Sequence, residues 1–162
     1  MKKNNYYLIT GGLGFIGSKI AEQILAKNKD SVCVLLDNFT VYIDPLYSAY
    51  GDYRKKRFEN IIDPKDYKAS KSKRIIVERG DASDPKITLE LISKYKPKII
   101  YHTAGMPLAR LKNAVSKEFR IGSVDTTTNL LECADSVQKS SKYKLERFLY
   151  ISSSMVYGDF KK

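Results

Sequence analysis

The chain has 162 residues, of which 43% are hydrophobic, 11% aromatic and 29% charged. This length and balance fit one globular domain with its own core, and they exclude a collagen-like, low-complexity or disordered chain. A formal net charge of +11 is compatible with a nucleic-acid partner, but the basic residues form only one dense run, Arg54–Arg57, so no nucleic-acid partner is expected.

The sequence predicts neither a membrane span nor an export signal. No segment approaches the roughly 18 uninterrupted apolar residues that a span requires. The N-terminus passes from Met1–Lys3 directly into the strand-like residues Tyr6–Thr10, without a cleavable apolar region. Cys33 and Cys133 each lie inside an apolar run as small buried hydrophobes, so neither a disulfide nor a metal site is predicted. We therefore expect a cytoplasmic protein without a membrane partner.

Short runs of apolar and β-branched residues alternate with helical periods, which is typical of a parallel sheet with crossover helices. The predicted strands are Tyr6–Thr10, Val32–Asp37, Arg74–Glu78, Ile99–Thr103 and Phe148–Ser152. Right-handed crossovers with one reversal give the strand order 3-2-1-4-5, and a ligand is expected at the carboxyl ends beside the switch point. The expected fold is therefore α/β, a Rossmann-like doubly wound parallel sheet that is truncated after the fifth strand.

Two helices show clear apolar periods. The stripe of the first helix comprises Ile16, Ile20, Ile24 and Leu25. Asp84 is placed to cap a later helix that begins at Pro85 and stops before Pro97. The apolar face of this later helix comprises Ile87, Leu91, Ile92 and Tyr95.

Two further regions are harder to assign. A long helical region is predicted from Asn113 to Val137, with a break near Ile121–Gly122. Its inward-facing residues are predicted to be Leu130, Leu131 and Ala134. The stretch from Phe39 to Lys73 is too long for an ordinary connection, and a helix is expected within it at Tyr53–Ile62.

A glycine motif follows the first strand. Gly11, Gly14 and Gly17 stand three residues apart in the segment TGGLGFIG, where strand turns into helix. Residues without Cβ allow a tight turn, close approach of backbone amides to a diphosphate, and close packing of helix on strand. Asp37 ends the second strand, where a carboxylate can accept hydrogen bonds from ribose hydroxyls and repel a 2′-phosphate. The pattern predicts a dinucleotide site that prefers NAD to NADP; the alternative is a structural turn with a surface aspartate.

Six segments, in the same order, resemble the extended short-chain dehydrogenase/reductase family, and within it the NAD-dependent nucleotide-sugar epimerases and dehydratases. They are Gly11–Gly17, Asp37–Phe39, Gly80–Ala82, His102–Gly105, Asn129–Glu132 and Ser152–Gly158. The resemblance covers nearly the whole chain and corresponds to the N-terminal portion of such an enzyme. It implies NAD as cofactor, a nucleotide sugar as substrate, and transient hydride transfer from a sugar carbon to bound NAD.

The resemblance also implies a set of cofactor-binding residues, namely Gly11, Gly14, Phe15, Ile16, Gly17, Asp37, Asn38, Asp81, Ala82, Ala104, Gly105 and Ser152. In this assignment the backbone around Phe15 and Ile16 contacts the pyrophosphate, and Asp37 contacts the ribose. Asp81 and Ala82 contact the adenine. Ala104 and Gly105 line the nicotinamide side, and Ser152 lies near the cofactor.

The implied catalytic residues are Ser153, four positions before Tyr157, and the adjacent Ser154, which would hydrogen-bond the sugar hydroxyl that is oxidised. The alternative for these serines is capping of a turn or helix. His102 is the only histidine in the chain, and its place in the pattern indicates a packed residue rather than an acid–base catalyst. The sequence departs from the usual pattern at Ser123 and Thr126, where asparagine and glycine are common.

The family's catalytic base is a tyrosine followed four residues later by a lysine, beyond the fifth strand. Tyr67 to Lys71 and Tyr157 to Lys161 have this spacing, and neither has this position. Residues 1–162 are therefore interpreted as an incomplete NAD-binding Rossmann domain without the substrate-binding domain, inactive by itself. An open sheet edge predicts self-association or a homodimer.

Alternative functions remain open at this point. The chain could be a non-catalytic dinucleotide-binding module or one piece of a split enzyme. The sequence does not decide which nucleotide sugar is used, which carbon reacts, or whether the outcome is epimerisation, dehydration, decarboxylation or reduction, because related folds carry out all of them.

Overall fold

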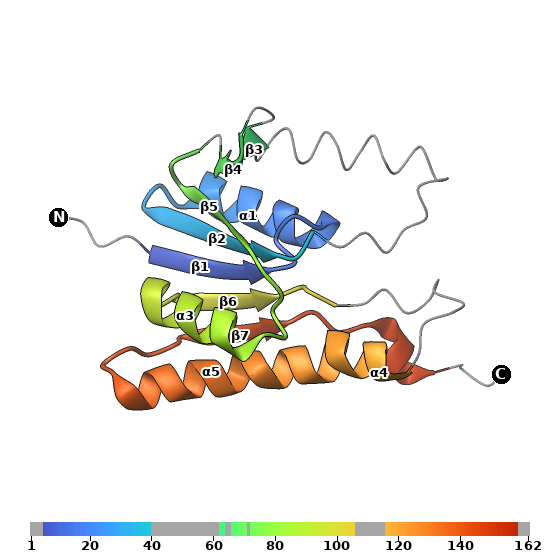
Figure 1. Ribbon diagram of the computed structural model, residues 1–162. Helices are drawn as coiled ribbons and strands as arrows, with labels where there is room; N and C mark the ends of the chain where they lie inside the picture. The colour runs from blue at the N-terminus through green and yellow to red at the C-terminus, as the bar shows by residue number, and fades with distance from the viewer. Residues whose placement is uncertain (1–4, 40–61, 64–65, 71, 106–115, 159–162) are drawn as a thin grey trace, which may run out of the picture.

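The structure is a computed structural model that describes residues 5–39, 62–63, 66–70, 72–105 and 116–158. Its centre is a five-stranded parallel sheet in the order β5-β2-β1-β6-β7, with helices on both faces (Figure 1). This arrangement confirms the predicted fold class and strand order. The strands are β1 (Asn5–Thr10), β2 (Ser31–Asp37), β5 (Ile75–Arg79), β6 (Ile99–His102) and β7 (Arg147–Tyr150).

The strand boundaries differ from the predicted ones by one or two residues. The largest difference is at β7, where the apolar run continues to Ile151 but the ladder ends at Tyr150. Tyr150 pairs with His102, and His102 is the last residue of β6, so no partner strand extends the pairing. Ser152 therefore lies beyond the sheet instead of ending the strand.

Both faces of the sheet are packed, and each has its own core. One face is covered by α1 (Phe15–Lys27), and its core comprises Tyr7, Ile9, Leu13, Ala21, Ile24, Cys33 and Leu35. The other face is covered by α3 (Pro85–Tyr95) and α5 (Thr126–Ser140), and its core includes Leu8, Val34, Leu36, Leu91, Ile92, Ile100, Cys133, Ala134 and Val137. The alternation of side chains along β1 and β2 separates the two cores.

The buried side of α1 differs from the predicted stripe. Gly17, Ala21 and Ile24 are buried, while Ile16 is 48% exposed. The small residues at positions 17 and 21 let the helix lie close to the sheet, which turns Ile16 outward.

The end of α1 is held by a distant side chain. The Arg74 guanidinium donates hydrogen bonds to the carbonyl oxygens of Leu25 and Asn28, at 3.1 and 3.0 Å. These carbonyl groups have no partner within the helix, so a positive side chain at this end stabilises it.

The start of α3 agrees with the prediction. The Asp84 carboxylate accepts hydrogen bonds from the backbone N–H groups of Lys86 and Ile87, at 2.9 and 3.4 Å, and Pro85 is the first helical residue. The helix ends at Tyr95, and the next residue, Lys96, has a left-handed φ of +47°. The local capping signal of Asp84 and Pro85 was therefore sufficient to predict where this helix begins.

The long helical region was predicted to break near Ile121–Gly122, and it does not. It runs from α4 (Ser116–Phe119) through a π-helical segment, η2 (Arg120–Asp125), into α5, and residues 113–115 lie outside the described part. The widened turn of η2 keeps the chain helical where the sequence indicated an interruption. The prediction for Leu131 was also wrong: this residue is 46% exposed, because Leu130, Cys133, Ala134 and Val137 form the inward stripe.

Two short elements were not predicted. β3 (Ile62–Asp63) and β4 (Asp66–Ser70) form an antiparallel pair that is separate from the main sheet. The helix expected at Tyr53–Ile62 lies outside the described residues, except that Ile62 belongs to β3. A short 3-10 turn, η3 (Ser154–Tyr157), follows β7. Within the described ranges, no helix has the length and apolar character to cross a membrane.

Candidate functional site

The turn between β1 and α1 is built from glycine. Gly11 has a φ of +63°, and a Cβ added there would lie 2.9 Å from the backbone nitrogen of Ala104. A Cβ at Gly17 would overlap the carbonyl oxygen of Gly11, so α1 can start this close to the strand only with glycine at that position. No side chain caps the N-terminus of α1 at Gly14. The turn therefore leaves space beside the positive end of the helix.

Asp37, the last residue of β2, lies beside this turn. Its Oδ2 accepts a hydrogen bond from the Leu13 N–H at 3.0 Å, and its Oδ1 accepts one from the Phe39 N–H at 2.9 Å. The two bonds fix the orientation of the carboxylate against the turn. A carboxylate offers about four acceptor positions, so each oxygen still has capacity to accept a bond from a ligand.

A second carboxylate, Asp81, follows β5. Its Oδ2 accepts a hydrogen bond from the Asn38 amide at 3.0 Å, and its Oδ1 accepts bonds from the Ser83 N–H and hydroxyl at 2.8 and 2.7 Å. Burial opposes ionisation, but these hydrogen bonds outweigh it and hold the pKa of Asp81 below its ordinary value. Two carboxylates therefore lie at the carboxyl ends of the neighbouring strands β2 and β5: Asp37 is the last residue of β2, and Asp81 follows β5.

The end of β6 closes the site on the other side of β1. The Thr103 hydroxyl donates to the Thr10 carbonyl oxygen at 2.7 Å, and the Ala104 N–H donates to the Thr10 hydroxyl oxygen at 3.2 Å. These bonds hold Ala104 against Gly11, where the missing Cβ leaves room for it. The two strand ends therefore form one wall.

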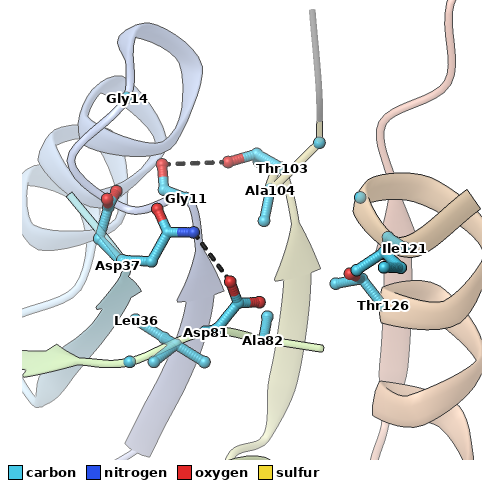
Figure 2. A pocket seen from close by; sticks show the side chains of 14 residues that line it. Gly11, Gly14, Leu36, Asp37, Asp81, Ala82, Thr103, Ala104, Ile121 and Thr126 are labelled. Carbon is cyan, nitrogen blue, oxygen red and sulfur yellow. Dashed lines mark hydrogen bonds between the residues drawn. The ribbon is translucent and has the colours of Figure 1, made fainter. Parts of the chain in front are cut away.

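The facing wall is the π-helical segment η2. The Thr126 N–H donates to the carbonyl oxygens of Ile121 and Ser123, and the Thr126 hydroxyl donates to the Ile121 carbonyl oxygen at 2.6 Å. Both positions at which the sequence departs from the common pattern, Ser123 and Thr126, thus take part in the widened turn. Ile121 and Thr126 lie on the helix across from Ala104 (Figure 2). Single π turns often occur at functional sites.

These elements enclose a cavity of about 330 Å³ at the carboxyl ends of β1, β2, β5 and β6 (Figure 2). It is lined by Gly11, Gly14, Leu36, Asp37, Asn38, Gly80, Asp81, Ala82, Thr103, Ala104, Gly105, Ile121, Gly122 and Thr126. In this sheet the direction in which successive strands are added reverses between β1 and β6. Open α/β sheets bind ligands in the crevice at such a switch point. The cavity lies where the sequence predicted a ligand.

The family of the chain is identified by a match over nearly its whole sequence. A sequence profile of the family described as GDP-mannose 4,6-dehydratase matches residues 8–162. The chain belongs to this family. The membership confirms the expected relationship to nucleotide-sugar epimerases and dehydratases.

Several curated relatives of this family member are dTDP-glucose 4,6-dehydratases. The protein of Neisseria gonorrhoeae is 30% identical over 161 residues, which cover 98% of this chain and 40% of the relative. The protein of Haemophilus influenzae is 27% identical over 155 residues, which cover 94% of this chain and 40% of the relative. The chain thus spans about two fifths of the length of these relatives.

Solved structures with the same fold include epimerases. The UDP-glucuronic acid 4-epimerase of Bacillus cereus, in complex with UDP-glucuronic acid and NAD, has a TM-score of 0.68 at 24% identity and covers 97% of this chain and 43% of that one. The Bordetella bronchiseptica enzyme WbmG, in complex with NAD and UDP, has a TM-score of 0.67 at 18% identity, over 96% of this chain and 40% of that one. At these identities the likeness establishes the fold.

Most of the predicted cofactor-binding residues of this family member line the cavity. They are Gly11, Gly14, Asp37, Asn38, Asp81, Ala82, Ala104 and Gly105. They come from four different strand ends, and the fold brings them together. Their contacts with a cofactor stay predictions.

The other predicted site residues do not line it. Phe15 and Ile16 lie in the first turn of α1, where their side chains are 77% and 48% exposed and line a separate groove. Gly17 packs behind the turn. Ser152 and Ser153 are exposed after β7, and Ser154 begins η3. The serines stay candidates for contact with a substrate rather than for the walls of the cavity.

Several residues of the site were not among the predicted cofactor-binding residues. Within the cavity these are Leu36, Gly80, Thr103, Ile121, Gly122 and Thr126. Gly80 and Thr103 lie inside the recognised segments Gly80–Ala82 and His102–Gly105. The residues predicted to bind the cofactor in these segments could therefore have indicated them. Ile121 and Gly122 were read as a helix break, and the correct reading needed the π-helical hydrogen bonds, which have no separate sequence signal.

Proposed function

We propose that residues 1–162 form an NAD-binding domain of a nucleotide-sugar epimerase or dehydratase. The observation that carries the proposal is the cavity itself, in which a glycine-rich turn, the N-terminus of α1 and two carboxylates meet at the switch point of the sheet. Family membership and the NAD-bound solved structures with this fold support the same cofactor.

The residues present fit a dinucleotide. A Cβ at Gly11 would collide with the Ala104 backbone, and one at Gly14 would crowd the Gly11 carbonyl oxygen, so glycine permits this tight turn. Both glycines line the cavity without adding a side chain to it, which leaves room for a bulky anionic group. A diphosphate placed at this turn faces the positive end of α1 and backbone N–H groups. The site therefore offers attraction to the diphosphate without a basic side chain.

The two carboxylates favour NAD over NADP. Asp37 is oriented by the N–H groups of Leu13 and Phe39, and its remaining acceptor positions suit the hydroxyls of the adenosine ribose. A 2′-phosphate at the same place would face the charge of Asp37. Asp81 and Ala82 are proposed to contact the adenine, and the hydrogen bonds from Asn38 and Ser83 keep Asp81 ionised and fixed.

The reactive end of the cofactor is proposed to lie between Ala104 and Gly105 on one side and the η2 segment on the other. Bound NAD supplies a hydride acceptor for a sugar carbon. The chain's own residues exclude water on this side and hold the ring, since Ile121 and Thr126 face the cavity. Ser153, after β7, is proposed to accept or donate a hydrogen bond at the sugar hydroxyl, with Ser154 adjacent and Ser152 near the cofactor.

The activity of the whole enzyme is also a proposal, because the chain spans about two fifths of its curated relatives. The substrate is proposed to be a nucleotide sugar. The outcome is epimerisation, which would make the enzyme an isomerase, or dehydration, which would make it a lyase. The 162-residue chain by itself is expected to bind NAD without turning over nucleotide sugars.

Two properties of the proposed domain have structural support. Cys33 and Cys133 are both buried and unpaired, which suits the reducing cytoplasm. β7 is an edge strand of the described sheet, and its last residue, Tyr150, and the following Ile151 are 51% and 42% exposed. Such an edge favours self-association or a homodimer.

The experiment is calorimetric titration of the chain with NAD and with NADP. We expect saturable heat with NAD and binding at least about tenfold weaker with NADP, because the Asp37 charge opposes a second phosphate. Absence of heat with NAD, or equal affinity for the two dinucleotides, would contradict the proposal.

Two variants sharpen the titration. Asp37→Asn removes the charge and keeps the shape, so the NADP penalty should shrink while NAD binding weakens. Asp135→Asn is the matched control, because Asp135 pairs with Lys139 on the exposed side of α5 and has no role in the cavity. Thermal melts of both variants show whether the loss of the bonds to Leu13 and Phe39 affects folding.

A further inference from the structure

Beside the cavity lies a buried histidine whose two ring nitrogens both have partners. His102, at the end of β6, is 1% exposed. Its Nδ1 lies 2.7 Å from the Thr10 hydroxyl oxygen, and its Nε2 lies 3.0 Å from the Thr127 hydroxyl oxygen. Phe148 and Tyr150 of β7 pack beside the ring, at centroid distances of 6.1 and 5.6 Å. The imidazole therefore bridges β1 and α5 in a setting closed to water.

The directions of these hydrogen bonds follow from their neighbours. The Thr127 hydroxyl donates its proton to the Ser123 carbonyl oxygen at 2.6 Å, so toward His102 it can only accept. His102 therefore carries its proton on Nε2, and its bare Nδ1 accepts from the Thr10 hydroxyl. The Thr10 oxygen in turn accepts from the Ala104 N–H.

The result is a chain of four hydrogen bonds that all point the same way. It begins at the Ala104 N–H, passes through Thr10, His102 and Thr127, and ends at the Ser123 carbonyl oxygen. We name it the His102 relay. One end holds the wall formed by β1 and β6, and the other end holds the η2 segment, which is the facing wall of the cavity.

We infer that His102 is a positioning residue that fixes the distance between the two walls of the cavity, and thereby the affinity for the dinucleotide. The inference rests on the proposed function, because the cavity is taken as the cofactor site. His102 does not line the cavity and does not touch its contents. It acts through Thr10 on Gly11 and Ala104, and through Thr127 on the turn that carries Ile121 and Gly122.

Neutral imidazole suits this role for a geometric reason. It has one donor and one acceptor on opposite sides of a rigid ring, so it can continue a directed chain across the gap between two elements. A protonated ring has two donors. The Thr10 oxygen would then face two donors, from Ala104 and from His102, and its own proton would lose its acceptor, so the relay would be broken at that point.

The test compares NAD affinity in variants of the 162-residue chain. His102→Phe keeps a buried aromatic ring and removes both hydrogen bonds, and Thr127→Val keeps the shape of Thr127 and removes its hydroxyl. Each should weaken NAD binding about tenfold, the ratio expected when a buried hydrogen bond is lost. Thr127→Ser restores the hydroxyl and should restore the affinity.

A control variant separates the effect of a changed distance between the cavity walls from that of a general loss of stability. Tyr143→Phe removes a buried hydrogen bond of 2.7 Å to the Pro97 carbonyl oxygen, at the opposite end of β6 from His102. This variant should lose stability and keep the NAD affinity of the wild type. In the double variant of His102→Phe and Thr127→Val the affinity loss should be no larger than in either single variant, because both break one chain.

A second measurement does not depend on the cofactor. Because His102 is the only histidine, the nitrogen spectrum of the imidazole is free of overlap, and it should show a protonated Nε2 and an unprotonated Nδ1. Thr10→Val should shift the amide signals of η2, although Thr10 lies on the other wall.

The outcomes are distinct. If the wild-type chain binds no NAD, the proposed function fails, while the spectrum still tests the relay. If the chain binds NAD and folded His102→Phe binds it equally well, the inference is wrong. If His102→Phe does not fold, the pair Thr127→Val and Thr127→Ser decides, and equal affinity of these two would overturn it.

Discussion

The two faces of the sheet are packed in different ways. The face beneath α1 is closed by apolar side chains such as Tyr7, Ile9 and Leu35. The face beneath α3 and α5 also has an apolar core, but most of the buried polar side chains lie there as well. They are Thr10, Thr88, His102, Thr126 and Asn129.

The polar residues of the second face lie toward the carboxyl ends of the strands, and they hydrogen-bond the segments that form the cavity. Thr10, His102 and Thr126 hold the two walls, and Asn129 holds the loop at Ala82. A buried polar group costs stability unless it is fully bonded, so its use here indicates a need for fixed geometry. The α1 face mainly stabilises the domain, and the α3 and α5 face mainly shapes the site.

The largest expected effect tests this division on the α1 face. Ile24→Ala removes a buried side chain of α1, and the free energy of unfolding should fall by about 4 kcal/mol, the usual cost of such a cavity. The affinity of the folded molecules for NAD should stay unchanged. Urea unfolding gives the first quantity and calorimetry the second. A weaker NAD affinity in fully folded Ile24→Ala would show that the α1 face also sets the geometry of the site.

The second prediction concerns pH and the other face. Burial lowers the pKa of His102 to about 4, from 6.5. The unfolded chain therefore binds a proton between these values and the folded chain does not, so stability is full above about pH 6.5 and falls as the pH decreases toward 4. The total loss is about 3 kcal/mol, since one pKa unit corresponds to about 1.4 kcal/mol.

Urea unfolding of wild type and His102→Phe at several pH values measures this loss. No other histidine is present, so the slope between about pH 7 and pH 5 should disappear in the variant. Asp81 has a lowered pKa, so its contribution is present above the ordinary aspartate pKa of about 4 and is lost only below it. Equal slopes in both proteins above about pH 5 would mean that His102 is accessible to protons in the folded state.

The same contrast explains what the sequence could predict. The handedness of crossovers, applied to the predicted strands, was sufficient for the strand order. A local signal was sufficient for the start of α3, where Asp84 and Pro85 stand next to the groups they affect. The glycine turn and Asp37 were recognised because their spacing along the chain reflects one strand–helix–strand unit. The buried side of α1 can be predicted largely from the periodicity of its apolar residues. Even there, Gly17 is buried and Ile16 is exposed, which differs from the predicted stripe.

The α3 and α5 face depends on pairs that are far apart in sequence. Thr10 and His102 are separated by 92 positions, and no periodicity connects them. A histidine and a threonine taken singly are compatible with packing, capping or catalysis, so only their placement shows the relay. The π-helical turn was read as a break for the same reason, because a shift of one hydrogen-bond partner leaves the composition of a helix unchanged.

The smallest expected effect tests a second polar cluster on the α3 and α5 face. The Asn129 amide donates to the Ala82 carbonyl oxygen at 2.8 Å and to the Thr88 hydroxyl oxygen at 3.1 Å. Asn129→Leu keeps the size and removes both bonds, so the free energy of unfolding should fall by about 2 kcal/mol. NAD affinity should fall about threefold, because the Thr88 hydroxyl still donates to Ala82 and the loop is only loosened.

The matched control for Asn129→Leu lies on the same helix. Ser140→Ala removes a hydroxyl that donates to the Val137 carbonyl oxygen near the end of α5, away from the cavity, and should change neither quantity by much. Unfolding and NAD titration are measured on both variants. If Asn129→Leu lost stability and bound NAD with unchanged affinity, the polar residues near Ala82 would serve the packing of α3 against α5. The shaping of the site would then be confined to the side of the cavity that His102 holds.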